Sequence, residues 1–128
     1  MQRVPGLRYA LDTGNFLYCD EELTAVLPEL LPFIADVHCK DRSLIPTGGD
    51  PLLSVAGRAL YPATVGDGAV PIRETVRDVI AYGYRGAFIV EQFDSANRLA
   101  DIRRSAENLQ EMFDTPTRAV TTCKECAH

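Results

Sequence analysis

Three side chains that commonly bind divalent metals close three short apolar segments of this sequence. Asp12 ends residues 7–12, His38 ends residues 33–38, and Glu91 ends residues 87–91. A donor set of carboxylates and imidazole without thiolates suits Mn²⁺, Mg²⁺, Co²⁺ or Zn²⁺, and the sequence does not choose among them. Each residue alone has an ordinary structural role, such as a turn cap, a core histidine or the partner of an arginine. Three such side chains at equivalent positions exceed what stability requires, so the sequence predicts a metal centre.

The apolar segments that carry these side chains are typical of buried strands. Residues 7–12 are followed by a turn at residues 13–15, and residues 87–91 form a continuous apolar run of the kind that is covered on both faces. After the first strand, Asp20 is the predicted N-cap of a helix that runs to residue 31, with acidic residues in its first turn. Pro28 is expected to kink this helix, and Pro32 is expected to end it.

Two further helices are predicted in the second half of the chain. Residues 43–70 are rich in glycine, proline and small residues, which predicts a long loop that is either functional or disordered. The next helix should start at Pro71 and stop at Gly83, and the last should span residues 97–113. Their apolar stripes are Ile72, Val76, Val79 and Ile80 in the first, and Leu99, Ile102, Ala106, Leu109 and Met112 in the second.

Strands and helices therefore alternate three times along the chain. This alternation predicts an α/β fold with parallel strands and right-handed crossovers. In such sheets ligands bind beyond the carboxyl ends of the strands, which is where Asp12, His38 and Glu91 are all expected. The predicted elements thus bring the three metal-binding side chains to one edge of the sheet.

The combination of motifs resembles a known family. The strings are LDTGN at 11–15, DVHCKD at 36–41, GDG at 66–68 with PI at 71–72, and GYRG at 83–86 leading to VE at 90–91. In this order they resemble the last three βα units of sugar phosphate isomerases/epimerases, which belong to the xylose isomerase-like TIM barrel superfamily. The resemblance covers residues 5–113. It implies a partial (β/α)8 TIM barrel of about three C-terminal βα units over residues 1–113, followed by a C-terminal tail at 114–128.

The resemblance also implies a reaction and a set of site residues. The family transfers a proton next to a carbonyl through an enediolate, and a divalent metal stabilises that intermediate. By motif, Asp12, His38 and Glu91 are the metal ligands, and Glu91 is also one of two glutamates that exchange the proton. The second glutamate and a fourth metal ligand belong to earlier strands that this chain does not contain. Expected contacts to a sugar or sugar phosphate are Asn15, Lys40, Asp41 and Arg42.

Composition and charge narrow the class of protein. The net charge of −5 gives no long-range attraction for a phosphate backbone, so nucleic-acid binding is not favoured. No apolar run approaches the length of a membrane span, and the first residues lack a secretory signal, so a cytoplasmic location is expected. The cysteines are then expected to be thiols. Cys123, Cys126 and His128 supply at most three zinc ligands, and a frayed tail is favoured over a zinc site.

Three interpretations follow from these observations. The leading one is a truncated isomerase/epimerase, whose open sheet edges predict self-association or a complementing half-barrel. A second is a fragment of a related barrel that cuts DNA at abasic sites, which the acidic charge and the scarcity of histidines disfavour. A third is a non-enzymatic metal-binding or interaction module built on the half-barrel and the cysteine tail.

Overall fold

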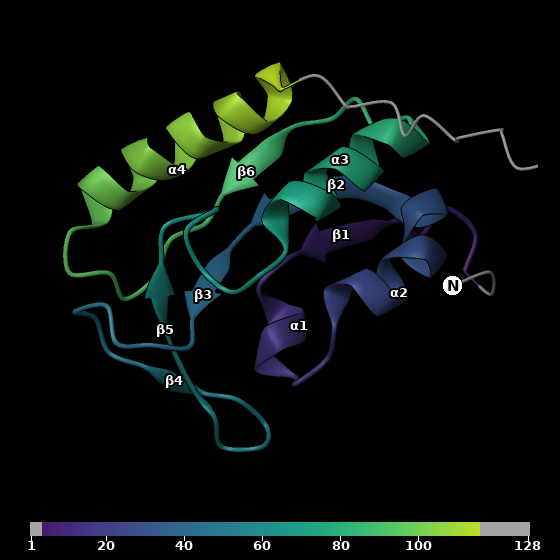
Figure 1. The fold of residues 1–128 in the computed structure, drawn as a ribbon. Coiled ribbons are helices and arrows are strands. Elements are labelled where there is room, and N and C mark those ends of the chain that lie inside the picture. The colour runs from purple at the N-terminus through teal and green to yellow at the C-terminus, as the bar shows by residue number, and fades with distance from the viewer. Residues whose placement is uncertain (1–3, 116–128) are drawn as a thin grey trace, which may run out of the picture.

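A three-stranded parallel sheet forms the centre of the molecule. The computed structural model describes residues 4–115, and Cys123, Cys126 and His128 of the predicted tail lie outside this range. Strands β1 (Tyr9–Asp12), β2 (Ile34–Cys39) and β6 (Phe88–Val90) pair in parallel in the order β1-β2-β6 (Figure 1). The predicted parallel α/β arrangement is therefore confirmed for these strands.

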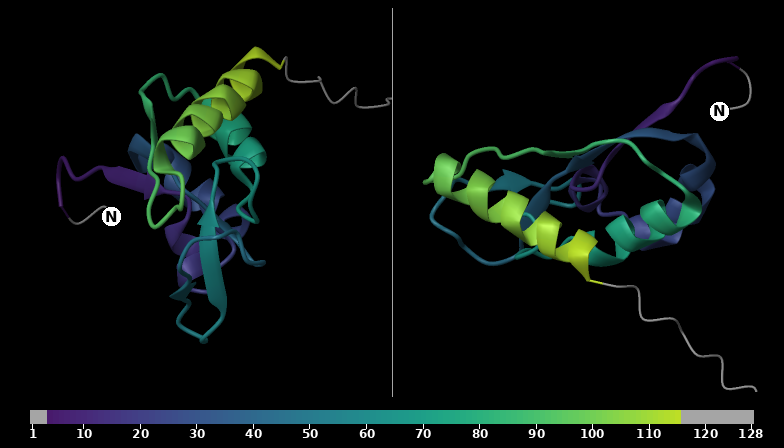
Figure 2. Two further views of the ribbon diagram at one scale, coloured as in Figure 1. Left: turned by 90° about the vertical axis from the view of Figure 1, so that its left-hand side faces the viewer. Right: turned by 90° about the horizontal axis from the view of Figure 1, so that it is seen from above.

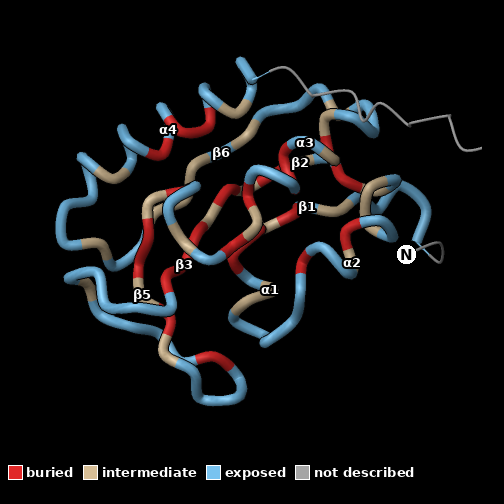
Figure 3. Tube along the Cα trace, in the orientation of Figure 1, coloured by how far each residue is buried: buried red, intermediate tan, exposed pale blue. Residues whose placement is uncertain are grey.

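The two faces of this sheet have different surroundings. Leu11, Val37 and Cys39 are fully buried, and they face the helices α2 (Leu23–Leu30), α3 (Ile72–Tyr82) and α4 (Arg98–Asp114). Figures 1 and 2 show these helices along one side of the sheet, and Figure 3 shows that the buried residues concentrate beneath them. Because side chains alternate along a strand, the intervening residues face the other side. On that side Ile89 is 40% exposed.

The predicted first helix is divided differently from the expectation. A short helix α1 (Asn15–Tyr18) precedes α2, and a 3-10 turn, η1 (Leu31–Phe33), follows it. Asp20 is not the N-cap: Glu22 holds that position, without a side-chain cap. Asp20 instead adopts a left-handed φ of 56° and its Oδ2 accepts a hydrogen bond of 2.7 Å from the backbone of Ala56. The side chain of Asp20 therefore makes a tertiary contact with Ala56 instead of capping the helix.

The expected long loop at residues 43–70 contains strands of a second sheet, so that prediction is wrong where these strands form and holds for the segments between them. Strands β3 (Asp41–Ser43), β4 (Leu52–Leu53) and β5 (Ala59–Ala63) pair antiparallel in the order β3-β5-β4. The strands are short, β4 is exposed and β5 contains Pro62, so their apolar periodicity is weak. These strands form because separate segments of the chain pair with each other, and no local sequence pattern predicts them.

The two later helices occupy nearly the predicted ranges. Helix α3 ends at Gly83, whose φ of +115° suits only glycine without strain. Helix α4 is capped by Asn97. Its buried face differs from the predicted stripe, because Leu99 is 62% exposed whereas Ser105 and Asn108 are buried with Leu109. Hydrogen bonds explain the difference: Ser105 Oγ accepts from the backbone N–H of Val65, and Asn108 donates to its carbonyl.

The predicted self-association depends on whether the edges of the parallel sheet are unpaired. In the described residues, β1 and β6 are the edge strands, and neither pairs with a further strand on its outer side. Self-association or a complementing half-barrel stays a prediction. Among residues 4–115 there is no helix of sufficient length and apolarity to cross a membrane.

Candidate metal centre

The three predicted metal ligands converge at the carboxyl ends of β1, β2 and β6. Asp12 is paired directly with His38 in the β1–β2 register, and Glu91 directly follows β6, where its backbone N–H bonds to Cys39 O at 3.0 Å. One ligand atom from each of Asp12, His38 and Glu91 lies within 4.8 Å of the other two. The sheet therefore presents two carboxylates and one imidazole to a common point, as the sequence predicts.

The imidazole of His38 is held between two carboxylates. Its Nδ1 lies 3.3 Å from Oε2 of Glu91, and its Nε2 lies 3.2 Å from Oδ2 of Asp36. Burial, the largest single influence, lowers the pKa of His38. The hydrogen bonds and negative charges of Glu91 and Asp36 together outweigh burial, so the pKa is raised above its ordinary value. The ring thus has one carboxylate partner inside the predicted ligand set and one outside it.

Lys40 connects the two carboxylates of the predicted ligand set. Its Nζ lies 2.8 Å from Oδ2 of Asp12 and 3.2 Å from Oε1 of Glu91. The lysine side chain is only 12% exposed, and its Nζ also lies 5.2 Å from the centre of the Phe93 ring. The ammonium therefore neutralises two negative charges that would otherwise repel each other at short range.

Thr13 fixes the backbone of Lys40 and was not predicted as a site residue. Its Oγ1 donates to the carbonyl of Lys40 at 2.7 Å and accepts from the backbone N–H of the same residue at 2.9 Å. Thr13 is 1% exposed. This reciprocal pair joins the loops after β1 and β2, and nothing in the sequence distinguishes it from an ordinary turn threonine.

Asp36 is a second residue of the site that was not predicted, although its position in the sequence carries a signal. It lies two positions before His38 on β2, so both side chains are on the same face of the strand. Its Oδ1 accepts a hydrogen bond of 3.0 Å from the backbone of Val37. The carboxylate that contacts His38 is therefore itself held in place.

Three of the four predicted substrate contacts line one cavity beside the metal-binding side chains. The cavity has a volume of about 330 Å³, and Asn15, Lys40 and Arg42 contribute to its wall. Arg42 is 6% exposed, and no carboxylate of residues 4–115 lies within ion-pair distance of its guanidinium. The remaining wall residues are Gly14, Tyr18, Leu52, Phe93 and Asp94.

The structure places the fourth predicted substrate contact, Asp41, in a different environment. The residue is 3% exposed, and its carboxylate accepts one backbone N–H group from β3 and three from the loop after β5. Burial raises the pKa of Asp41, and these hydrogen bonds oppose that shift. Asp41 thus anchors its own chain and does not line the cavity formed by its neighbours. The four donors, at 2.8–3.0 Å, are Arg42, Gly66, Gly68 and Val70.

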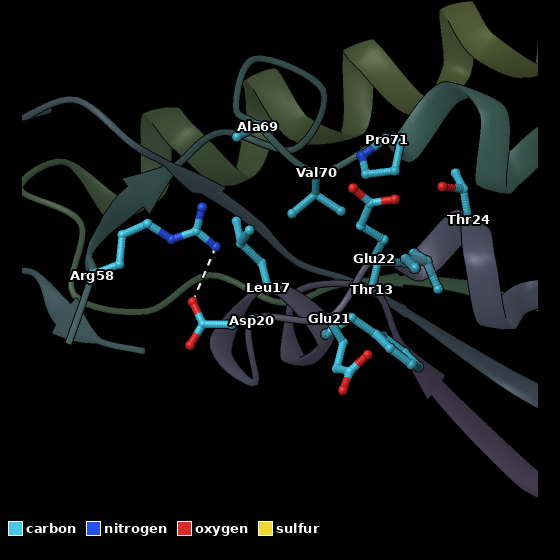
Figure 4. Close-up of a pocket in the computed structure, with 12 residues that line it drawn as sticks. Thr13, Leu17, Asp20, Glu21, Glu22, Thr24, Arg58, Ala69, Val70 and Pro71 are labelled. Carbon is cyan, nitrogen blue, oxygen red and sulfur yellow. Dashed lines mark hydrogen bonds and ion pairs between the residues drawn. The ribbon is translucent and has the colours of Figure 1, made fainter. Parts of the chain in front are cut away.

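A second and larger cavity has a volume of about 490 Å³. It opens between the corner that joins α1 to α2 and the loop that leads to α3, and Figure 4 shows its acidic rim with the ion pair between Arg58 and Asp20. None of the three predicted metal ligands lines this cavity. Thr13, which follows Asp12 and bonds the backbone of Lys40, does line it, so the cavity adjoins the candidate metal centre without including its ligands.

Comparison with known proteins supports the fold. No protein-family model matches the sequence, and no curated protein matches it either. Among solved structures, the chain is similar to a xylose isomerase domain protein from Planctomyces limnophilus, with a TM-score of 0.67 and 20% sequence identity. The similarity covers 86% of this chain and 37% of that chain, so the chain spans little more than a third of that protein. This chain therefore shares the fold of part of that xylose isomerase domain protein.

Proposed function

We propose that this chain carries part of the active site of a metal-dependent sugar isomerase or epimerase. The observation that supports this function is the convergence of Asp12, His38 and Glu91 within 4.8 Å at the ends of three adjacent parallel strands. Ligand sites at this edge are the rule for barrels and open sheets of parallel strands. The xylose isomerase-like fold of the chain agrees with the same reaction class.

The donor atoms fit a divalent cation of intermediate hardness. Two carboxylates and one imidazole converge, whereas the thiol of Cys39 is fully buried on the opposite, helix-covered face. This set suits Mn²⁺, Mg²⁺, Co²⁺ or Zn²⁺ bound through oxygen and nitrogen. When bound, the metal would act as a Lewis acid that polarises a substrate carbonyl and stabilises the developing negative charge.

Glu91 is the proposed acid/base residue of this chain. One of its oxygens contacts Lys40 and the other contacts His38, so its carboxylate is oriented from both sides. A glutamate held in this way can take a proton from the carbon next to a carbonyl and return it. The second proton-transferring group of the reaction, which the family resemblance implies, belongs to strands outside this chain.

The cavity lined by Asn15, Lys40 and Arg42 is the proposed sugar site. Lys40 belongs both to this cavity and to the network with Asp12 and Glu91, so a molecule bound there would reach the metal-binding side chains. The buried guanidinium of Arg42 supports binding of hydroxyl groups or of a phosphate. Asp41 would act indirectly, by holding the loop at residues 66–70.

Metal binding is the first test of this function. Adding Mn²⁺ or Co²⁺ should raise the melting temperature of the wild-type chain, and His38→Ala and Glu91→Ala should each abolish the increase. Asp78→Ala is the matched control, because it also removes one charged group but lies on α3 in an exposed pair with Arg77. An equal increase in the two site variants and the control would disprove the assignment.

Proton exchange is the second test. In heavy water with bound metal, the chain should incorporate deuterium next to the carbonyl of a ketose or a ketose phosphate, as detected by proton NMR. Glu91→Gln should stop this exchange while preserving most of the side-chain shape. Metal binding without exchange on either substrate would retain the metal site and remove the proposed reaction.

A further inference from the structure

Asp36 stands beside the candidate metal centre without belonging to its ligand set. The three converging ligands come from Asp12, His38 and Glu91, and Asp36 lies on the other side of the imidazole. Its contact to His38 spans 3.2 Å between Oδ2 and Nε2. The function of this third carboxylate is not explained by the proposed reaction.

The two ring nitrogens of His38 have different tasks in this geometry. Nδ1 is on the side of Glu91, at 3.3 Å from its Oε2, so Nδ1 is the nitrogen directed at the converging ligands. Only a deprotonated ring nitrogen can bind a metal, and in a neutral imidazole the other nitrogen then carries the proton. That other nitrogen is Nε2, and the acceptor opposite it is Asp36.

We propose that Asp36 is a positioning residue that accepts a hydrogen bond from Nε2–H of His38. This bond fixes the tautomer and the ring plane in which Nδ1 faces a divalent cation shared with Glu91. The carboxylate is suited to this task because the backbone N–H of Val37 holds its other oxygen at 3.0 Å. Carboxylates in this relation to a ligating histidine orient the ring and increase its basicity toward the metal.

The inference rests on the proposed metal site, but it makes a separate statement about the metal-free protein. Without metal, Asp36 should favour the Nε2–H tautomer of the neutral ring of His38, in competition with Glu91, which faces Nδ1. The chain has only two histidines, His38 and His128, so their ring signals can be assigned by comparison with His38→Ala. Long-range proton–nitrogen correlation spectra of metal-free protein at alkaline pH then report the tautomer directly.

Two Asp36 variants and one control make the test specific. Asp36→Ala removes the acceptor at Nε2 and leaves Glu91 opposite Nδ1, so the tautomer of His38 should shift toward Nδ1–H. Asp36→Asn keeps an oxygen that can accept from Nε2–H, so it should retain the tautomer largely and restore part of the metal affinity. Asp78→Ala removes the same charge from an aspartate of similar exposure and should change neither measurement.

Metal affinity is measured by calorimetric titration with Co²⁺ or Mn²⁺. Asp36→Ala should weaken binding by about tenfold to a hundredfold, the range usual for the outer partners of metal-bound histidines. An unchanged tautomer together with unchanged affinity in Asp36→Ala would overturn the inference. If the wild type binds no metal, the proposed function fails, and the tautomer measurement alone still decides whether Asp36 orients the ring.

Discussion

The ammonium of Lys40 lies 2.8 Å from Oδ2 of Asp12, one of the three candidate metal ligands. Since the same nitrogen lies 3.2 Å from Oε1 of Glu91, the lysine contacts both carboxylates of the candidate ligand set. A metal ion and this ammonium are thus expected to compete for the same negative charge.

Lys40→Met should therefore tighten divalent metal binding. Without the ammonium, the carboxylates of Asp12 and Glu91 repel each other until a metal neutralises them, so we expect affinity to rise about tenfold or more. The metal-free variant should lose about 1–3 kcal/mol of unfolding free energy, because two largely buried carboxylates lose their partner. Calorimetric titration and urea denaturation measure the two effects.

The control for this prediction is Arg104→Met. It also removes a positive charge, but from an exposed contact with Asp67 that spans 3.7 Å. Surface pairs of this kind contribute little, so both metal affinity and stability should stay near wild type. Weaker metal binding in Lys40→Met would show instead that the lysine assists the metal.

Thr13→Val should destabilise the protein although it preserves the volume of the side chain. The substitution removes the hydroxyl that bonds both backbone groups of Lys40, and both groups are then left without that partner. We expect the unfolding free energy to fall by about 2–4 kcal/mol. Thr13→Ser keeps the hydroxyl and should lose only about 1 kcal/mol, for the missing methyl group. Equal losses in both variants in urea denaturation would attribute the effect to packing.

Asp41→Asn should destabilise the loop at residues 66–70 and the fold with it. An amide offers one acceptor oxygen in place of two, so its NH₂ group would face backbone N–H donors that the carboxylate now accepts. The expected loss is about 2–4 kcal/mol in thermal or urea unfolding. Asp50→Asn, at an exposed position, should stay within about 0.5 kcal/mol of wild type. An unchanged unfolding free energy in Asp41→Asn would mean that the loop does not depend on this carboxylate.

Cys39 should resist thiol reagents for as long as the protein is folded. Burial raises the pKa of Cys39 from 9.0 to about 12, so almost no thiolate exists at neutral or mildly alkaline pH. In a Cys123→Ser/Cys126→Ser background, a disulfide reagent should label the exposed Cys19 rapidly and Cys39 only on unfolding. Rapid modification of two thiols in the folded protein would contradict the buried position.

The same raised pKa gives a pH dependence of stability with a defined sign. The folded state binds the thiol proton of Cys39 more tightly than the unfolded state does. The resulting contribution to the unfolding free energy is complete below pH 9.0 and is lost as the pH rises through about 12. Between these values the unfolding free energy of the wild type should fall more steeply than that of Cys39→Ala, by up to about 1.4 kcal/mol per pH unit. Parallel pH profiles in urea denaturation would show that Cys39 does not titrate on unfolding.

The sequence by itself determined the parallel strands and the position of the candidate metal ligands at their carboxyl ends. The apolar segments before Asp12, His38 and Glu91 are local patterns, and parallel pairing brings their carboxyl ends to one edge irrespective of details. The same local signals placed the helices that end at Gly83 and begin at Asn97. For these elements, short-range preference and the final fold agree, so a single sequence is sufficient to predict them.

Tertiary structure decided which polar side chains share an environment. Lys40 and Asp41 are neighbours in sequence, yet one joins the candidate metal ligands and the other is buried among the N–H groups of residues 66–70. The antiparallel sheet within residues 41–63 depends on pairing between segments that have little apolar pattern of their own. Hydrogen bonds to Val65, together with Leu109 of the predicted stripe, define the buried face of α4. Such contacts join residues that are far apart in the chain, and their energies depend on burial and geometry that exist only after folding.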